Sequence, residues 1–201
     1  MSGKEDPKIP LTTIAERGDL ILYVGGTKDA KRQDVKKLLV SSAILIQLSK
    51  VFAAPLGPHF REGQASRSES DPQVIELPED NTNAIEDMCN LLHLNVVADR
   101  SRPKAKSDAP RVLCLAVAID KYDLVDVLRL QWLGLLHAIS TEGPQLVAAA
   151  AYVLDQPDAF WAATRRWTMD GRHVSIHESL RHDKVCRYLP ARIFGDLRSI
   201  G

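Results

Sequence analysis

The chain lacks the features that mark membrane-spanning, secreted and strongly charged proteins. None of its apolar runs is long enough to cross a bilayer, and its polar N-terminal segment has no apolar core of signal-peptide length. Its 26 basic residues balance its 26 acidic residues, so no net charge draws it to nucleic acid or to an anionic membrane. Local basic clusters at 100–106 and 165–166 are interpreted as solvated faces. We therefore expect a cytoplasmic or nuclear protein with no direct nucleic-acid or membrane partner.

Cysteine is scarce and its spacing carries no chemical motif. Cys89, Cys114 and Cys186 form no CxxC pair, which argues against a structural zinc site and against a redox motif. Each lies among apolar or helix-forming residues and is interpreted as a buried thiol in a reducing compartment. Structural zinc usually needs two closely spaced ligand pairs, so we expect no metal. The weak alternative is a site built from residues near the C-terminal end: His173, His177, His182 and Cys186.

Sequence motifs of the main catalytic classes are also missing. The chain has no nucleophile elbow and no metalloprotease motif. Residues 25–28 contain glycine, threonine and lysine after an apolar run, but they lack the spacing of a phosphate-binding loop and predict a hairpin turn. His93 lies in an apolar segment and is interpreted as a packed or helix-end histidine, not a catalytic base. We expect a protein that is not an enzyme and that binds no cofactor.

The first half of the chain contains short strand-like and helix-like segments. Residues 19–24 are rich in β-branched and aromatic side chains and predict a buried strand, with residues 35–40 as a second strand hairpinned to it. Residues 74–78 predict a third short strand. Residues 41–52 predict a single helix with serine caps that Pro55 ends. Its apolar face comprises Ile44, Leu45, Leu48, Val51 and Phe52.

A further helix is predicted to contain Ile85, Met88, Leu91 and Leu92, and the residue at which it begins is ambiguous. Asn81, Thr82 and Asn83 could each cap it, and Asn83 with Glu86 has the spacing of a capping box. Residues 99–110 have no large apolar side chain and predict a linker or long loop. Beyond the linker, helices are predicted over 112–122, 124–139, 144–154 and 158–168.

Five segments, in a fixed order, resemble the successive signatures of a BTB/POZ domain. They are residues 18–25, 39–42, 44–52, 60–63 and 75–80. Residues 116–124 also resemble the family's helix that ends in Asp-Lys-Tyr-Asp, and the whole pattern is most similar to BTB proteins of filamentous fungi. The resemblance implies an α+β fold, a BTB/POZ-like small sheet capped by helical hairpins, here followed by an all-helical C-terminal extension.

The resemblance also implies a division of the chain. We expect an N-terminal tail over 1–14, a BTB/POZ-like domain over 15–125, a helical extension over 126–170 and a C-terminal tail over 171–201. No kelch, zinc-finger or MATH segment is present. A substrate-binding surface would therefore have to lie on the second-half helices or on the loops.

The function that the resemblance implies is protein binding. Family members commonly form homodimers, and many are substrate adaptors that bind the cullin scaffold of a ubiquitin ligase. Others are scaffold or transcription-associated oligomerisation proteins without a ligase role, and this is the alternative here. Cullin-binding members carry a hydrophobic-x-Glu motif after the helix of the third segment, and Phe60-Arg61-Glu62 matches it by type and place. The competing interpretation is that Phe60 fills the domain's own core and Glu62 caps or solvates a turn.

Self-association is expected to use the same region. The candidate residues are Asp19, Ile44, Leu45, Leu48, Val51 and Phe52.

Overall fold

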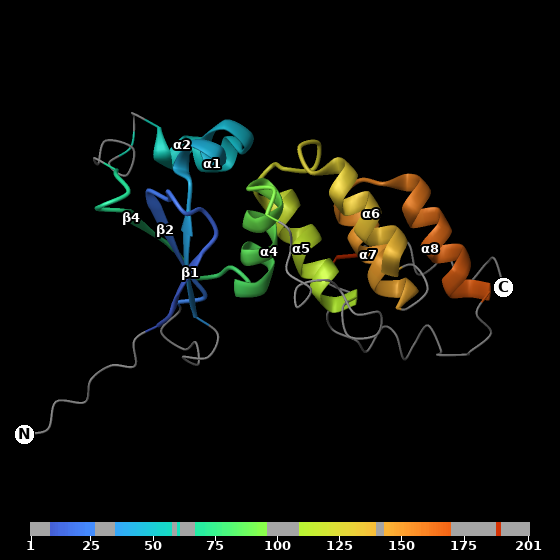
Figure 1. Cartoon of the computed structure of the whole chain (residues 1–201). Helices are drawn as coiled ribbons and strands as arrows, with labels where there is room; N and C mark the ends of the chain where they lie inside the picture. The colour runs from blue at the N-terminus through green and yellow to red at the C-terminus, as the bar shows by residue number, and fades with distance from the viewer. Residues whose placement is uncertain are drawn as a thin grey trace, which may run out of the picture. The chain divides into compact units, whose positions relative to one another are not determined.

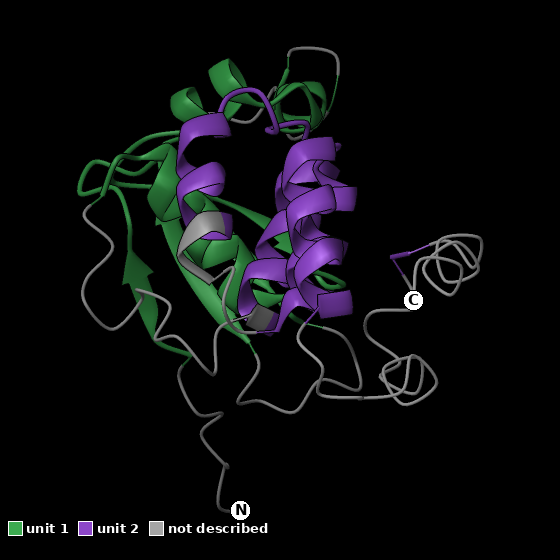
Figure 2. Cartoon of the chain, turned by 90° about the vertical axis from the view of Figure 1, so that its right-hand side faces the viewer, with its two compact units in different colours: residues 1–98 green, residues 99–201 purple. Residues whose placement is uncertain are grey.

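The computed structural model describes residues 9–26, 35–57, 60, 67–95, 109–139, 143–169 and 188–189. Four strands and seven helices are found in these ranges. The chain divides into two compact units, residues 1–98 and residues 99–201 (Figure 2). All four strands belong to the first unit, and the second unit is helical where it is described. The described structure is therefore mixed α/β and compatible with the predicted α+β class.

A four-stranded mixed sheet of order β1-β3-β2-β4 organises the first unit (Figure 1). β2 (Leu20–Val24) and β3 (Lys36–Val40) form the predicted antiparallel hairpin. β4 (Gln73–Leu77) runs parallel to β2, and β1 (Leu11–Thr13) runs parallel to β3. β1 lies inside the segment that was expected to be a tail. The sequence does not predict it, because a three-residue strand is too short to show a period-two pattern. The hairpin turn predicted at 25–28 is described only as far as Gly26.

Alternation along the strands places one face of the sheet in the core. Leu20, Leu22 and Val24 of β2 are fully buried, as are Leu38 and Val40 of β3. Because side chains alternate in direction along a strand, the residues between them lie on the opposite face and are partly exposed. Helix α4 (Thr82–Leu92) contacts β3 and also α1 (Ser42–Leu48), which places it over the sheet.

The single helix predicted over 41–52 is wrong, because the chain forms two helices there. α1 ends at Leu48, and α2 (Lys50–Leu56) follows a single extended residue, Ser49. The Ser49 hydroxyl accepts a hydrogen bond from the Phe52 N–H at 3.2 Å, so the serine begins a new helix. Pro55 lies inside α2 and does not end it. In a helix this short, its missing N–H removes only one bond of the last turn.

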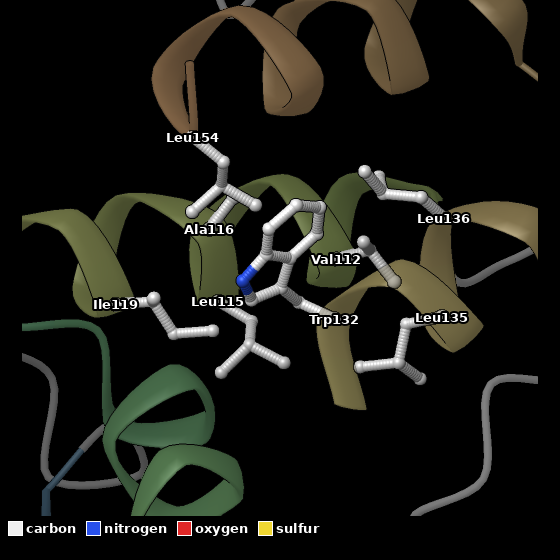
Figure 3. Close-up of a pocket in the computed structure, with 8 residues that line it drawn as sticks. All are labelled: Val112, Leu115, Ala116, Ile119, Trp132, Leu135, Leu136 and Leu154. Atoms are coloured by element: carbon white, nitrogen blue, oxygen red, sulfur yellow. The ribbon is translucent and has the colours of Figure 1, made fainter. Parts of the chain in front are cut away.

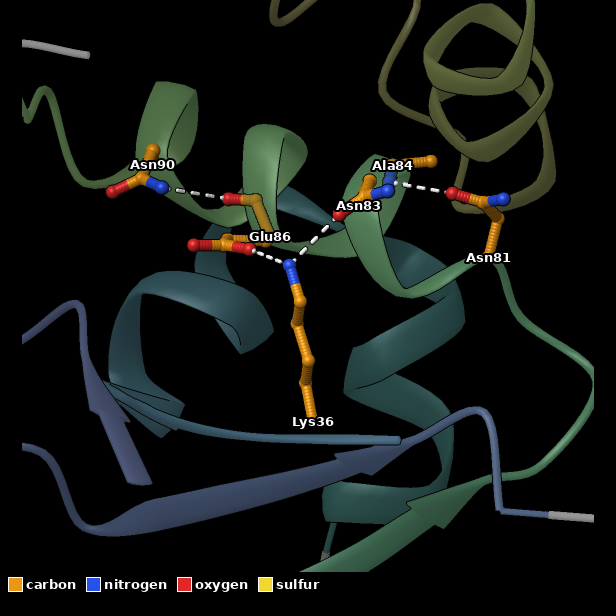
Figure 4. A network of polar contacts seen from close by, with 6 residues as sticks. All are labelled: Lys36, Asn81, Asn83, Ala84, Glu86 and Asn90. Carbon is orange, nitrogen blue, oxygen red and sulfur yellow. Dashed lines mark hydrogen bonds and ion pairs between the residues drawn. The ribbon is translucent and has the colours of Figure 1, made fainter. Parts of the chain in front are cut away.

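The start of α4 is settled in favour of the first of the three candidate caps, and the capping-box spacing of Asn83 and Glu86 is not used as a cap. Asn81 is the cap, and its side-chain oxygen accepts from the Ala84 N–H at 2.9 Å (Figure 4). Asn83 and Glu86 instead accept hydrogen bonds from the Lys36 ammonium of β3, the first at 2.8 Å. This half-buried Lys36–Glu86 ion pair joins the sheet to the helix. The two residues are therefore engaged in a tertiary contact instead of a local cap.

Helices alone make up the described part of the second unit, as predicted. They are α5 (Ala109–Lys121), α6 (Arg129–Ile139), α7 (Pro144–Val153) and α8 (Pro157–Met169). α7 contacts α5, α6 and α8, and a run of buried alanines, residues 148–151, lets neighbouring helices approach it. α6 begins at Arg129, five residues after the predicted start at 124, because Asp123 adopts a left-handed φ of 53° and turns follow it.

The two compact units divide at residue 98, just before the predicted 99–110 linker. Helix α5 belongs to the second unit in this division, whereas the expected BTB/POZ-like domain runs to 125 and includes it.

Candidate functional site

Phe60, the first residue of the predicted docking motif, is exposed. Its side chain is 52% accessible, and its backbone N–H donates to the Gly57 carbonyl at 3.3 Å. Arg61 and Glu62 lie outside the described residues. An aromatic ring that is half accessible does not fill the unit's own core. The interpretation that Phe60 is a core residue is therefore wrong, and the ring is available to a partner.

Helix α2 fixes the point at which Phe60 leaves the core. Phe52 and Leu56, one helical turn apart, are both 2% exposed and hold α2 against the unit. The helix ends at Gly57, whose extended backbone redirects the chain. Because Phe60 follows this end, it is not part of the buried helical stripe. The two phenylalanines of this region thus have opposite roles, one as an anchor and one as an exposed side chain.

The residues predicted for self-association divide between core and surface. Leu45 and Phe52 are buried and Val51 is 40% exposed, while Ile44 and Leu48 are half-buried. The break at Ser49 rotates α2 relative to α1, so these five side chains do not share one continuous face. A partner can reach Ile44, Leu48 and Val51.

Asp19, the sixth residue of that set, is engaged within its own unit. Its carboxylate accepts from the Ser42 backbone N–H at 2.7 Å and from the Ser42 hydroxyl at 2.6 Å. These bonds satisfy a free N–H at the start of α1, whose own N-cap, Ser41, makes no side-chain cap bond. Asp19 therefore positions α1 after the β2–β3 hairpin.

His93 is a packed histidine at the end of α4, as interpreted from the sequence. Its Nδ1 lies 2.8 Å from the Cys89 carbonyl, and its Nε2 accepts from the Ser41 backbone N–H at 3.0 Å. A carbonyl can only accept, so Nδ1 carries the proton and the ring is neutral. Burial lowers the pKa of His93, and the bond to Cys89 opposes that shift. Both ring nitrogens are used in structure, which leaves none for catalysis.

A reactive Cys89 thiol and a metal cluster find no support in the described ranges, and Cys114 is only partly buried, unlike the buried thiol that the sequence predicts. Cys89 is buried, and burial together with the nearby Glu86 carboxylate raises the pKa of its thiol to about 12. It is therefore an unreactive core residue at neutral pH. No cluster of three potential metal ligands occurs in the described part of the chain. The possible ligands His173, His177, His182 and Cys186 all lie outside it.

An apolar pocket in the second unit is lined by no side chain that could act as a catalytic acid, base or nucleophile (Figure 3). The indole of Trp132 is the only polar side chain that lines it, and its N–H donates to the Val125 carbonyl at 2.9 Å. With no acid, base or nucleophile among them, these side chains make a packing site between helices of one unit. The lining residues are Val112, Leu115, Ala116, Ile119, Trp132, Leu135, Leu136 and Leu154.

One exposed cluster was missed by the sequence analysis. Trp161 of α8 is 62% exposed, and the Arg165 guanidinium lies 5.2 Å from its ring centroid. They are four residues apart and are therefore neighbours on one face of the helix. The spacing of an aromatic residue and an arginine at i and i+4 could have located this pair from the sequence. A cation over an aromatic face is a weak local contact, and here it holds both side chains at the surface.

The chain matches no protein-family model and no curated protein. The BTB/POZ resemblance therefore stays a prediction. None of the described helices is long and apolar enough to cross a membrane.

Proposed function

We propose that the chain is a BTB/POZ-type protein-interaction module that self-associates and acts as a substrate adaptor for a cullin-based ubiquitin ligase. The ordered resemblance of five segments supports the family, and the α+β architecture is compatible with it. The observation that carries the adaptor role is the exposure of Phe60 directly after α2. The proposed cullin contact is Phe60-Arg61-Glu62.

The physical basis is the burial of an anchored aromatic ring. Covering a phenylalanine side chain contributes about 1.5–3 kcal/mol, and Phe60 has about half of that area free. Aromatic side chains that fill a partner's pocket are frequent centres of binding energy. A carboxylate two residues away, Glu62, can pair with a basic or amide group and so fix the register of the contact.

The test is the binding of a purified cullin N-terminal domain to the full chain. Replacing both Phe60→Ala and Glu62→Ala should weaken binding at least tenfold, the equivalent of about 1.4 kcal/mol. Isothermal titration calorimetry measures the affinity. Because Phe60 lies outside the core, the unfolding midpoint of the variant should match that of the wild type.

Val127→Ala is the matched control. It shortens another exposed apolar side chain, 41% accessible and outside the residues proposed for either contact, and should leave cullin binding unchanged. Wild-type affinity in the Phe60 and Glu62 double variant would refute the adaptor proposal.

The alternative is a scaffold or transcription-associated oligomerisation protein with no ligase role. What favours it is the partial exposure of Ile44, Leu48 and Val51 on neighbouring helices. A chain that dimerises in light scattering at micromolar concentration but binds no cullin fits this alternative.

A further inference from the structure

Among the described residues, strand β4 is the last strand on one side of the sheet, and no hydrogen bond joins the backbone of its outer edge to another of them. In the order β1-β3-β2-β4 its only described neighbour is β2. The Gln73 N–H donates to the Asp19 carbonyl, and the Leu77 carbonyl accepts from the Gly25 N–H, both at 3.1 Å. Successive residues of a strand point these groups to opposite sides. The N–H and C=O of Val74 and Glu76 therefore point away from β2, where the described residues offer no further strand.

The side chains of these two residues are exposed and differ in chemistry. Val74 is 54% exposed and Glu76 is exposed as well. In the register of the sheet, Val74 lies beside Ile21 and Glu76 beside Tyr23. An added strand would continue these two rows, with one side chain next to Val74 and another, two residues along, next to Glu76. The first position favours an apolar residue and the second a basic residue.

The segment that contains β4, residues 68–80, is acidic. It has no lysine or arginine, although Arg67 directly precedes it. Glu69 forms an ion pair with Arg17 at 3.8 Å, which is exposed and contributes little. The segment contains five acidic residues: Glu69, Asp71, Glu76, Glu79 and Asp80.

The negative charge of this segment determines which kind of strand can bind at the β4 edge. A second copy of the chain paired edge to edge would bring the two acidic segments together, which costs energy. A basic extended segment would gain both backbone hydrogen bonds and opposite charge. Pro72 and Pro78 flank β4, so the edge that can pair is about five residues long.

We propose that the β4 edge binds an extended, basic segment of a partner protein as a fifth strand. Its pattern is an apolar residue opposite Val74 and a lysine or arginine opposite Glu76. Such strand addition takes its affinity from main-chain hydrogen bonds and its specificity from alternate side chains. Within β4 there is no proline, lysine or bulge to block an added strand, and its one charged side chain, Glu76, disfavours an acidic partner strand and favours a basic one. The surface is independent of the cullin contact at Phe60.

The first experiment uses amide hydrogen exchange by NMR on the full chain. The probes are two capped nine-residue peptides of threonine that differ at one position. The lysine peptide carries a central valine followed two residues later by a lysine, so that both lie on one face of a strand, and the glutamate peptide has glutamate in place of that lysine. The lysine peptide should bind saturably and slow exchange of the Val74 and Glu76 amides at least tenfold. The amides of Gln73, Ile75 and Leu77 already face β2 and should not change. Equal binding of the glutamate peptide, or unchanged exchange at Val74 and Glu76, would overturn the proposal.

Two substitutions separate strand addition from charge attraction. Val74→Pro removes an N–H that faces outward while the bonds to β2 remain, so it should abolish binding of the lysine peptide without unfolding the sheet. Glu76→Lys should weaken binding at least tenfold, and Glu79→Lys, the same change just beyond the strand, should have a much smaller effect. If Val74→Pro does not fold, the comparison of peptide affinity between Glu76→Lys and Glu79→Lys still tests the proposal. Equal losses of affinity in these two variants would overturn it.

Two further controls identify the occupant. Phe60→Ala should leave peptide binding unchanged, so a failure at the β4 edge and a failure of cullin binding are distinguishable. Light scattering of the peptide-free chain tests the second copy as occupant. A dimer whose Val74 and Glu76 amides are already protected would overturn the proposal in favour of edge pairing between two copies.

Discussion

His93 joins three parts of the first unit through one ring. It lies at the end of α4, its Nδ1 donates to the Cys89 carbonyl of the preceding turn, and its Nε2 receives the Ser41 N–H between β3 and α1. The bond from the Ser41 N–H exists only in the neutral ring, because a protonated Nε2 would become a donor facing another donor, whereas the Nδ1 bond to Cys89 is compatible with both forms. The residue therefore links the stability of this unit to pH.

The pH dependence has a definite sign. Burial lowers the pKa of His93 in the folded state below its unfolded value of about 6.5. Its stabilising contribution is thus present above about pH 6.5 and is lost as the pH falls through the lower, folded pKa. We predict that urea unfolding gives a lower free energy at pH 5.5 than at pH 7.5. In the His93→Gln variant, whose glutamine does not titrate, the free energy of unfolding should fall less between pH 7.5 and pH 5.5.

The comparison between wild type and variant isolates one residue. The chain has six histidines, and the other five are common to both proteins. Their contributions cancel when the two changes in unfolding free energy are subtracted. Equal losses in both proteins would show that His93 is not the pH-sensitive group.

At the scale of elements, one serine converts an expected helix into two. Ser49 is 1% exposed, and its hydroxyl caps α2 through the Phe52 N–H. Loss of a serine cap typically costs about 1 kcal/mol. We predict that Ser49→Ala lowers the free energy of unfolding by about this amount in urea titrations.

Ser41→Ala is a control at the neighbouring helix. Ser41 is the N-cap of α1, but its side chain makes no cap bond there because Asp19 satisfies the Ser42 N–H. Its own backbone N–H, which His93 accepts, is retained in alanine. The substitution should therefore change stability by only a few tenths of a kcal/mol. A loss as large as that of Ser49→Ala would contradict the capping role assigned to Ser49.

These elements show what the sequence could and could not predict. β2, β3, β4 and the helices of the second unit carry clear periodicity over several residues, and all were predicted. β1 has only three residues and carries no pattern. The break at Ser49 arises because the Ser49 hydroxyl competes with backbone carbonyls for the Phe52 N–H. The spacing of apolar residues does not reveal this competition. The cap of α4 was ambiguous because Lys36, 47 residues before Asn83, decides the outcome.

The candidate site could be predicted only in part, because the exposure of its residues depends on contacts elsewhere in the unit. The order of the family-like segments located Phe60, but nothing in the local sequence says whether a ring after a helix break turns inward or outward. Exposure depends on Phe52 and Leu56 filling the core ahead of it. The β4 edge needed the strand order of the sheet, which places β4 beside β2 and leaves its other side open. Strand order is a property of the whole unit and cannot be derived from one segment.

At the scale of the whole molecule, the two compact units carry different spectroscopic probes. The chain has three tryptophans, and all of them, Trp132, Trp161 and Trp167, belong to the second unit. The first unit contains none. Tryptophan fluorescence therefore follows unfolding of the second unit, while far-ultraviolet circular dichroism follows helices and strands of both. Each unit has its own buried apolar side chains, which is the condition for separate unfolding.

We predict that the two units unfold separately in urea. Leu22→Ala removes a fully buried side chain of β2 and should destabilise the first unit by about 2–5 kcal/mol. The dichroism signal should then fall in two steps, with the first step shifted to lower urea, while the fluorescence midpoint stays at its wild-type value. Leu128→Ala, a comparable change at a side chain 1% exposed in the second unit, should move the fluorescence midpoint. If Leu22→Ala moves that midpoint equally, the chain unfolds as one cooperative body.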